Sequence, residues 1–172
     1  MTMLATERLR LRPLVSADVP ALHRFCNDPE VRRYLWDNQE VSTEQVQDIV
    51  VRSQSCFDEF GAGYFAIEML DTPGEFAGFC GYRRFESSNQ PELLYGILPE
   101  FRGQGFVTEA AKAVLKYGFD RCEMSSVIAA TDTPNQASVG VLQRLGLFFR
   151  ERREYHGLDT VFYGLSREEF SG

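Results

Sequence analysis

Apolar and polar residues alternate with a period of two over several stretches of the chain, which is typical of half-buried β-strands. Arg8-Leu9-Arg10-Leu11-Arg12 is the first such stretch. Residues 76–85 are almost continuously apolar instead, as expected for a strand covered on both faces. The last two of the predicted strands are expected to form a hairpin around His156-Gly157. Seven strands are predicted, at residues 8–12, 64–70, 76–85, 92–98, 125–131, 147–155 and 160–165.

A period near 3.6 marks the helices, and capping residues mark their ends. Ser16 is the expected N-cap of the first helix. Ser42, with Gln45 three residues later, predicts a capping box at the start of the second, and the glycines at 61 and 63 end it. Four helices are predicted, at residues 16–27, 42–60, 105–121 and 134–145, with a short helical turn at 28–35.

Two connections stand out between the strands, and the chain contains no obvious linker. A tight turn is expected at Thr72-Pro73-Gly74-Glu75, where proline and glycine suit a type II turn, and a loop at Ser87–Asn89. The order of elements is β-α-α-β-β-β-α-β-α-β-β. A length of 172 residues without repeats or low-complexity segments predicts a single domain over residues 1–172.

The balance of charges narrows the function classes. The formal net charge is -7 and the pI is about 4.9, which argues against a nucleic-acid-binding surface. An acidic chain is compatible with a cationic or amine-bearing substrate. The N-terminal residues lack the apolar core of a signal peptide, and no apolar run reaches transmembrane length, so no membrane association is expected.

The cysteines give no sign of a metal site. Cys26, Cys56, Cys80 and Cys122 are widely spaced, and no CxxC or Cys/His cluster occurs. We therefore expect no metal and reduced, mostly buried thiols in a cytoplasmic protein.

A glycine-rich connection between a strand and a helix carries the main functional signal. It reads Pro99-Glu-Phe-Arg-Gly-Gln-Gly105. Gly103 and Gly105 remove side chains where the backbone turns into the helix, so that amides there can point at one anion. The dipole of the helix favours a phosphate at this end, and Arg102 can add a charge-assisted contact.

Other phosphate loops fit less well. The third glycine and downstream acid of a Rossmann loop are absent, and so is the Lys-Ser/Thr of a Walker A loop. From Gly-x-Gly alone, an ordinary glycine-rich turn is an equally good interpretation. The residues around the loop change this balance.

Several motifs in order resemble the GNAT family of N-acetyltransferases, and within it the RimJ/RimL-like branch. Arg102-Gly-Gln-Gly105-Phe-Val107 resembles the family's acetyl-CoA motif, although Val107 stands where Gly or Ala is usual. The remaining similarities are to the branch's opening Thr6–Pro13, its strand 92–98, its Thr108-Glu-Ala110 and its Asn135-x-x-Ser138 helix ending at Gly146.

The resemblance implies an α+β fold with one mixed, mostly antiparallel central sheet of about seven strands, flanked by about four helices. Its central strands would be splayed at the cofactor site. It implies acetyl-CoA as co-substrate, with the pyrophosphate on the loop amides and the pantetheine arm pairing like an extra strand. The cofactor-contacting residues would be Ile97, Leu98, Arg102, Gly103, Gln104, Gly105, Phe106, Val107, Thr108 and Asn135.

Catalysis needs a neutral amine, a donor for the oxyanion and an acid for the departing thiolate. Many family members supply that acid as a tyrosine on the helix after the asparagine, where this chain has Leu142. Ser138 is the substitute candidate, with a pantetheine contact or a helix-surface role as the alternative. Glu154 resembles the position of a base in ribosomal-protein acetyltransferases, with a solvated strand glutamate as the alternative. Trp36 is placed by the resemblance over the acceptor pocket or in packing.

The preferred hypothesis is transfer of acetyl from acetyl-CoA to a primary amine by direct attack in a ternary complex. The acceptor would be a protein N-terminus or a small molecule, and the chain a monomer or homodimer. A non-catalytic acyl-CoA-binding or sensing module is the alternative, and a nucleotide-binding protein that uses the same loop is the third.

Overall fold

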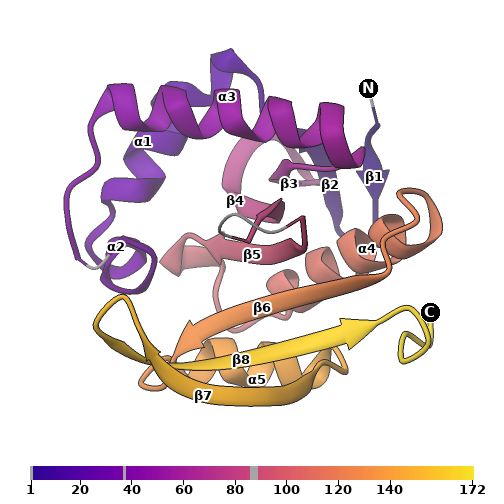
Figure 1. Ribbon diagram of the computed structural model, residues 1–172. Helices are drawn as coiled ribbons and strands as arrows, with labels where there is room; N and C mark the ends of the chain where they lie inside the picture. Colours follow the sequence, from indigo (N-terminus) through magenta and orange to yellow (C-terminus); the bar gives the residue numbers. More distant parts are fainter. Residues whose placement is uncertain (1, 37, 86–88) are drawn as a thin grey trace.

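The computed structural model describes residues 2–36, 38–85 and 89–172, so Ser87 and Ser88 of the expected loop lie outside the described residues. One eight-stranded sheet runs through the described part, in the order β1-β2-β3-β4-β5-β6-β8-β7 (Figure 1). The strands are β1 (Leu4–Ala5), β2 (Leu9–Pro13), β3 (Tyr64–Met69), β4 (Thr72–Arg84), β5 (Pro91–Ile97), β6 (Ser126–Asp132), β7 (Phe148–Tyr155) and β8 (Leu158–Ser166).

The predicted fold class is confirmed. Each described pair of neighbouring strands is antiparallel except β5 and β6, which are parallel, so the sheet is mixed and mostly antiparallel. The strand beyond the predicted seven is β1, which pairs with β2 through Leu4↔Leu11. Two residues are too few to display a period of two, which is why the pattern of the sequence does not reveal this strand.

Five α-helices accompany the sheet in the described residues. The capping box at the start of α3 is confirmed, since Ser42 Oγ accepts from the Gln45 amide and Gln45 Oε1 accepts from the Ser42 amide. Ser16 is not an N-cap; it begins a short 3₁₀ turn that leads into α1. The helices are α1 (Val19–Asn27), α2 (Pro29–Leu35), α3 (Thr43–Phe60), α4 (Phe106–Asp120) and α5 (Gln136–Arg144).

The expected tight turn at residues 72–75 is wrong. The β3–β4 hairpin turns at Leu70-Asp71, because Met69 pairs directly with Thr72. The register then shifts, since Phe76 pairs with Glu68, the residue next to Met69. Pro73 and Gly74 therefore lie in a bulge of β4, a place that tolerates both residues in a sheet.

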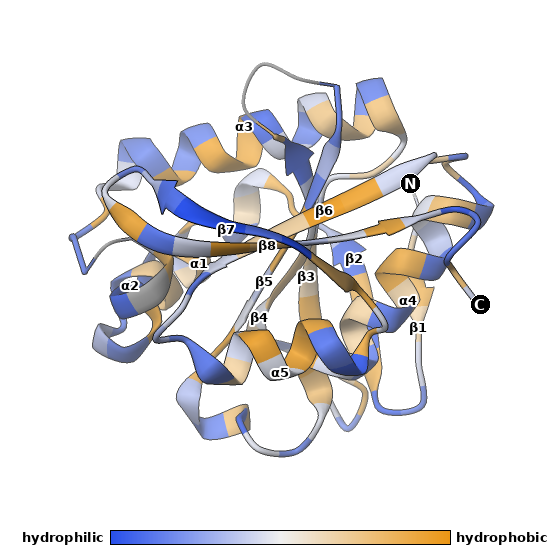
Figure 2. Ribbon diagram, turned by 60° about the horizontal axis from the view of Figure 1, so that its bottom comes forward, coloured by the Kyte–Doolittle hydropathy of each residue, from blue (hydrophilic) through white to orange (hydrophobic). Residues whose placement is uncertain are grey.

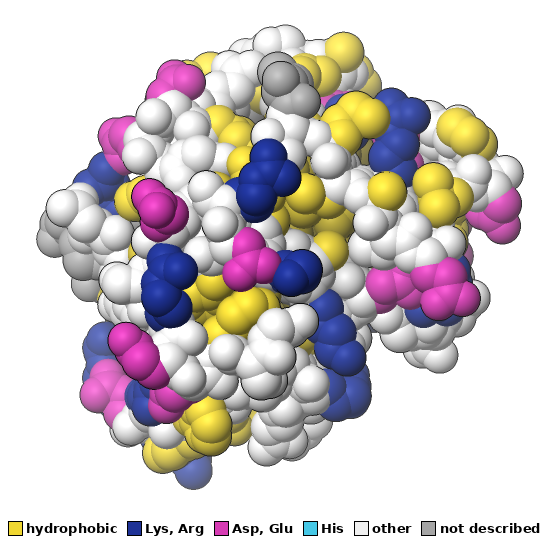
Figure 3. Space-filling view, turned by 90° about the vertical axis from the view of Figure 1, so that its right-hand side faces the viewer, with side chains coloured by type: hydrophobic (Ala, Val, Ile, Leu, Met, Phe, Trp, Pro, Cys, Tyr) yellow, Lys and Arg dark blue, Asp and Glu magenta, His cyan; other side chains and the backbone are white. Residues whose placement is uncertain are grey.

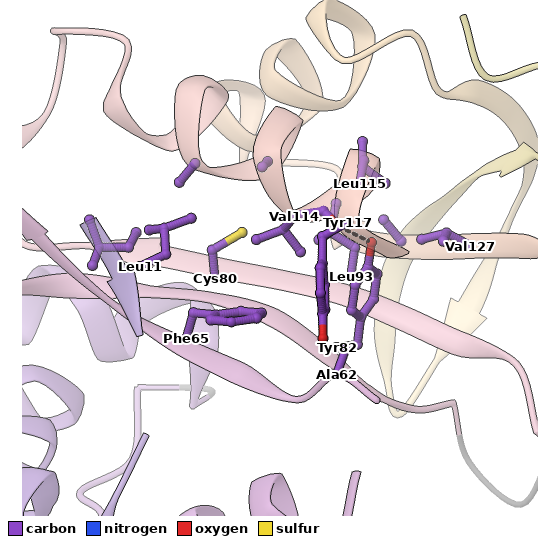
Figure 4. Close-up of a cluster of buried hydrophobic side chains, with 14 of the residues drawn as sticks. Leu11, Ala62, Phe65, Cys80, Tyr82, Leu93, Val114, Leu115, Tyr117 and Val127 are labelled. Atoms are coloured by element: carbon purple, nitrogen blue, oxygen red, sulfur yellow. Dashed lines mark hydrogen bonds between the residues drawn. The ribbon is translucent and has the colours of Figure 1, made fainter. Parts of the chain in front are cut away.

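Two apolar layers cover the opposite faces of the sheet. Alternate strand residues divide between them, as Leu93 faces the layer with α4 and α5, and Leu94 the layer with α1, α2 and α3. The α4 side includes the fully buried Tyr82, whose hydroxyl donates to the Val114 carbonyl at 2.8 Å (Figure 4). Figure 2 shows α4 and α5 turning apolar positions inward, whereas the edge strand β7 is hydrophilic and exposed.

The sheet opens between its two parallel strands. Glu92↔Ile128 is the one register pair between β5 and β6 in the described residues, although both strands continue beyond it. On its other side β5 stays paired with β4 as far as Ile97, and β6 stays paired with β8 as far as Asp132. The predicted splay of the central strands is therefore confirmed.

Candidate active site

The opening between β5 and β6 is the mouth of a cleft of about 850 Å³. Residues of α2, β4, the loop before α4, α5 and the β7–β8 hairpin complete its wall. A volume of this size suits a cofactor-sized ligand. The cleft runs from the start of α4 to the β7–β8 hairpin, and α2 lies along it, beginning beside the loop, where Arg102 Nη2 donates to the Glu30 carbonyl oxygen at 3.4 Å.

The glycine-rich loop forms the α4 end of the cleft. Gly103 and Gly105 have φ values of 77° and 81°, in the left-handed region that favours glycine. Gly105 is the N-cap of α4, and Phe106 is the first helical residue. The amides of the first helical turn have no intrahelical acceptor, and they meet the positive end of the helix dipole. The loop is therefore built to receive an anion.

Arg8 fixes this loop from the start of the chain. Its Nη1 donates to the Gln104 carbonyl oxygen at 2.9 Å, and its Nε donates to Glu109 Oε1 at 2.8 Å. The guanidinium also lies 4.4 Å from the centroid of the Phe106 ring. Burial alone would raise the pKa of Glu109, but hydrogen bonds from Thr6 and from the Arg8 amide and guanidinium lower it. Glu109 thus stays ionised and ties the loop to the N-terminal segment.

The predicted cofactor-contacting residues divide into two groups. Leu98 and Gln104 are absent from the cleft wall, and the Leu98 amide donates to the Ala77 carbonyl oxygen at 2.8 Å. The Arg102 amide is also engaged, with the Pro99 carbonyl oxygen. The others line the cleft: Ile97, Arg102, Gly103, Gly105, Phe106, Val107, Thr108 and Asn135.

Tyr95, a strand tyrosine for which the sequence favoured a packing role over a place in the cleft, faces α5. The Tyr95 hydroxyl lies 2.9 Å from Ser138 Oγ, and it donates to the Ser138 carbonyl oxygen at 3.2 Å. Asn135 Oδ1 accepts from the Ser138 amide at 3.2 Å and so caps α5. Burial raises the pKa of Tyr95, so its hydroxyl stays protonated. Leu142 is buried in the core, and the phenol near this helix comes from β5 instead.

A buried carboxylate lies at the other end of the cleft. Glu92 is only 4% exposed, and its Oε1 accepts from Arg83 Nε at 2.8 Å. The two residues are cross-strand partners in β4 and β5. An acidic residue within the apolar stretch 92–98 is the signal by which the sequence could have revealed it. Glu154, in contrast, is exposed on β7 and is not part of the cleft wall.

The acceptor-side wall combines apolar and polar groups. Tyr155, His156 and Leu158 of the β7–β8 hairpin contribute to it, and His156-Gly157 forms the predicted turn with φ values of 51° and 79°. Trp36 lies outside this wall and lines a smaller cavity next to it.

The surface charges, the cysteines and the helices can be compared with the sequence-based expectations about nucleic acid, metal and membrane. The face in Figure 3 carries basic and acidic side chains side by side, with apolar areas between them. All four cysteines are free thiols. The described residues contain no group of three or more His, Cys, Asp or Glu that could hold a metal ion.

No helix in the described part of the chain is long and apolar enough to cross a membrane.

Comparisons with known proteins agree with this architecture. The family model of the acetyltransferase (GNAT) domain matches residues 8–147. The N-acetyltransferase p20 of Bacillus licheniformis is 27% identical over the whole of both chains. The N-acetyltransferase YoaA of Bacillus subtilis is 32% identical over 84% of this chain and 81% of its own.

A solved structure shows the same fold. RimL, a ribosomal alpha-N-protein acetyltransferase in complex with coenzyme A, superposes with a TM-score of 0.81 at 22% identity, over 96% of this chain and 98% of its own. The chain therefore belongs to the GNAT acetyltransferase family and is an acetyl-CoA-dependent acetyltransferase, as its sequence predicted.

Proposed function

We propose that the enzyme transfers the acetyl group of acetyl-CoA to a primary amine, by direct attack within a ternary complex. One observation carries the proposal: a single cleft joins an anion-binding helix start to the buried carboxylate of Glu92, through the gap between β5 and β6. Acetyl-CoA carries phosphates at one end and a thioester at the other, which matches this polarity.

The cofactor is held by the loop and by the open strand edges. The amides of Phe106 and Val107 bind the pyrophosphate. The space beside Gly103 is open, since no atom lies within 4 Å of the position that a Cβ would take there, and this leaves room for the phosphates. Ile97 and Asn135 border the gap through which the pantetheine arm passes. Only the backbone amide is needed at Val107, so its side chain is compatible with this binding.

Glu92 receives the amine. Its Oε1 is paired with Arg83, and the carboxylate faces the cleft from a nearly water-free site, where an ammonium gains more from the charge than it would in bulk water. A proton passes from the ammonium to the Glu92 carboxylate. The neutral nitrogen then attacks the thioester carbonyl carbon.

The leaving thiolate is protonated from the α5 side of the gap. As the C–S bond breaks, the Tyr95 hydroxyl gives its proton to the sulfur, and Ser138 Oγ supports the phenol at 2.9 Å. The ammonium loses two protons in total. One leaves through Glu92. The other is released from the nitrogen as the amide forms and replaces the proton that Tyr95 gave to the sulfur. The products are the acetylated amine, free coenzyme A and one proton.

The acceptor is an amine of a protein N-terminus or of a small molecule. RimL, which shares the fold, is described as an alpha-N-protein acetyltransferase, and this supports the first possibility. The open wall formed by Tyr155, His156 and Leu158 gives room for either.

Acetyl transfer is tested with purified enzyme, acetyl-CoA and a panel of amines and short peptides, by following the release of free thiol. Glu92→Gln and Glu154→Gln compare two carboxylates with the same loss of charge. We expect Glu92→Gln to lower kcat by at least about 100-fold and Glu154→Gln to change it little. The reverse result would assign the base to Glu154.

The non-catalytic alternative makes a different prediction. A binding module would take up coenzyme A tightly, measured by calorimetry, yet release no thiol with any acceptor and form no acetylated product by mass spectrometry. That outcome would overturn the proposed function. A preference for ATP over coenzyme A in the same titration would favour the nucleotide-binding alternative.

A further inference from the structure

A second cavity adjoins the acceptor end of the cleft. It measures about 160 Å³ and lies under α1, α2 and α3, against the sheet face formed by β3, β4 and β5. Leu35, Arg83 and Leu94 line both the cleft and this cavity, so the two spaces share a wall. We call it the side pocket.

The side pocket is large enough for one substrate side chain. An apolar cavity of about 150 Å³ accommodates benzene. Most of the wall is apolar, including Leu22, Ile49 and Phe79, and it belongs to the layer with α1–α3. The space therefore suits one aromatic ring or one branched aliphatic group.

Its position relative to Glu92 fits an acceptor bound by its amine. Leu94 is two residues after Glu92 on β5, so both side chains leave the same face of the sheet about 7 Å apart along the strand. Arg83 is the cross-strand partner of Glu92 and lines both spaces. An amine at Glu92 thus has its neighbouring carbons at the shared wall.

The pocket also contains a buried donor. Trp36 Nε1 is buried and has no oxygen or nitrogen partner in the described part of the chain. The group that faces it is the Cys26 thiol, a weak acceptor, and burial raises the pKa of this thiol to about 12, so it stays neutral. Trp36 and Cys26 therefore present no charge to the pocket, and the charged residues of its wall are Arg52 and Arg83.

We propose that the side pocket receives the side chain of the acceptor, and that the enzyme selects primary amines carrying one aromatic or branched aliphatic group two or three bonds from the nitrogen. The proposal rests on the proposed function, since it names the substrate class of the same site. An N-terminal leucine or phenylalanine of a peptide has this chemistry, and 2-phenylethylamine is its simplest analogue.

Binding is measured without turnover through Trp36, the single tryptophan of the chain. Its fluorescence is excited at a wavelength that phenyl rings do not absorb, while 2-phenylethylamine or ethylamine is added to the enzyme with coenzyme A. We expect a saturable change with 2-phenylethylamine at a Kd at least about tenfold below that of ethylamine. Identical responses to the two amines would overturn the proposal.

Substitutions on α3 provide matched variants. Ile49 lines the pocket, whereas Val51, two residues later, is 58% exposed. Ile49→Phe fills the space and is expected to lower kcat/KM for 2-phenylethylamine about tenfold or more, and to leave ethylamine unchanged. Val51→Phe should change neither. Because a larger residue can disturb folding, Ile49→Ala tests the converse, a gain in kcat/KM for amines with a larger ring.

The two proposals fail in different ways. Absence of thiol release with every amine would overturn the proposed function, while the fluorescence titration would still decide whether the pocket binds the ring. Transfer to both amines with equal kcat/KM in the unsubstituted enzyme, and no effect of Ile49→Phe, would overturn the side pocket alone.

Discussion

The guanidinium of Arg8 donates a hydrogen bond at 2.9 Å to the backbone carbonyl oxygen of Gln104, which lies 96 residues later in the chain. This bond holds the Gln104 carbonyl of the Gly-Gln-Gly turn toward the N-terminal segment. Gly105 and Phe106, which follow it, line the cleft. A residue that need not touch the ligand therefore shapes the anion site.

Arg8→Ala is expected to weaken coenzyme A binding about tenfold, because the loop loses one charge-assisted hydrogen bond worth about 1.5 kcal/mol. Calorimetric titration of each variant with coenzyme A measures the change. Arg121→Ala, which removes an exposed cation at the far end of α4, serves as the control and should leave Kd unchanged. Equal affinity in both variants would show that the loop holds its shape without Arg8.

Tyr95→Phe is expected to lower kcat by about 100-fold with little change in KM for acetyl-CoA, because the thiolate loses its proton donor. Ser138→Ala keeps the phenol and should have a smaller effect. Steady-state kinetics over a range of pH separates the two roles. A rise in KM with unchanged kcat would instead assign Tyr95 to cofactor packing.

Two helical glycines should respond to alanine with opposite signs. Alanine is ordinarily better than glycine in a helix by about 1 kcal/mol. A Cβ at Gly118 would lie 2.6 Å from the Tyr82 hydroxyl, which is buried and bonded to Val114 (Figure 4). At Gly140 it would meet only the flexible end of Arg144, at 3.2 Å.

Gly118→Ala is therefore expected to destabilise the protein by about 1–2 kcal/mol, since overpacking exceeds the gain in helix propensity. Gly140→Ala should stabilise it by about 0.5–1 kcal/mol. Urea unfolding of both variants measures the difference. A stabilising effect at both positions would contradict the tight packing of α4 against Tyr82.

The ion pair of Arg12 and Asp18 should make the folded state sensitive to acid. Both Asp18 oxygens accept from the guanidinium, at 2.7 and 2.8 Å, and Oδ2 also accepts from the Val15 amide. Burial alone would raise the pKa of Asp18, but these hydrogen bonds lower it. A lowered pKa stabilises the fold above the unfolded value of about 3.9, and this contribution is lost as the pH falls through the folded value.

Asp18→Asn is accordingly expected to cost about 1.5–3 kcal/mol at neutral pH and to flatten the loss of stability below about pH 4. Asp48→Asn removes an exposed carboxylate paired with Arg52 and should cost only about 0.3–0.5 kcal/mol. Urea midpoints at neutral and acid pH decide the matter. An unchanged acid profile in Asp18→Asn would refute the assignment.

Local signals allowed much of the fold to be predicted. The capping box of Ser42 and Gln45 and the His156-Gly157 turn depend on residues close together in the chain, and both are present. The predicted turn at Pro73-Gly74 was wrong because proline and glycine also suit a bulge. Only the pairing of β4 with β3 distinguishes a turn from a bulge here.

Less of the site could be predicted, because the residues that contact each other there are far apart in the sequence. Tyr95 and Ser138 are 43 residues apart, and Arg8 and Gln104 are 96 apart. A strand periodicity gives the face of Tyr95, but not the helix that lies opposite. The loop at 103–105 could be located because glycine at a helix start has a local conformational meaning.

The single register pair between β5 and β6 leaves two strand edges facing each other inside a sheet. Exposed edges at the rim of a sheet invite other chains to add to them and aggregate. Here the gap is bounded on both sides by paired strands, so its open edges face the cleft and not another chain. The same unpaired backbone groups that would recruit another chain at the periphery are, in the interior, available only to a ligand that enters the cleft.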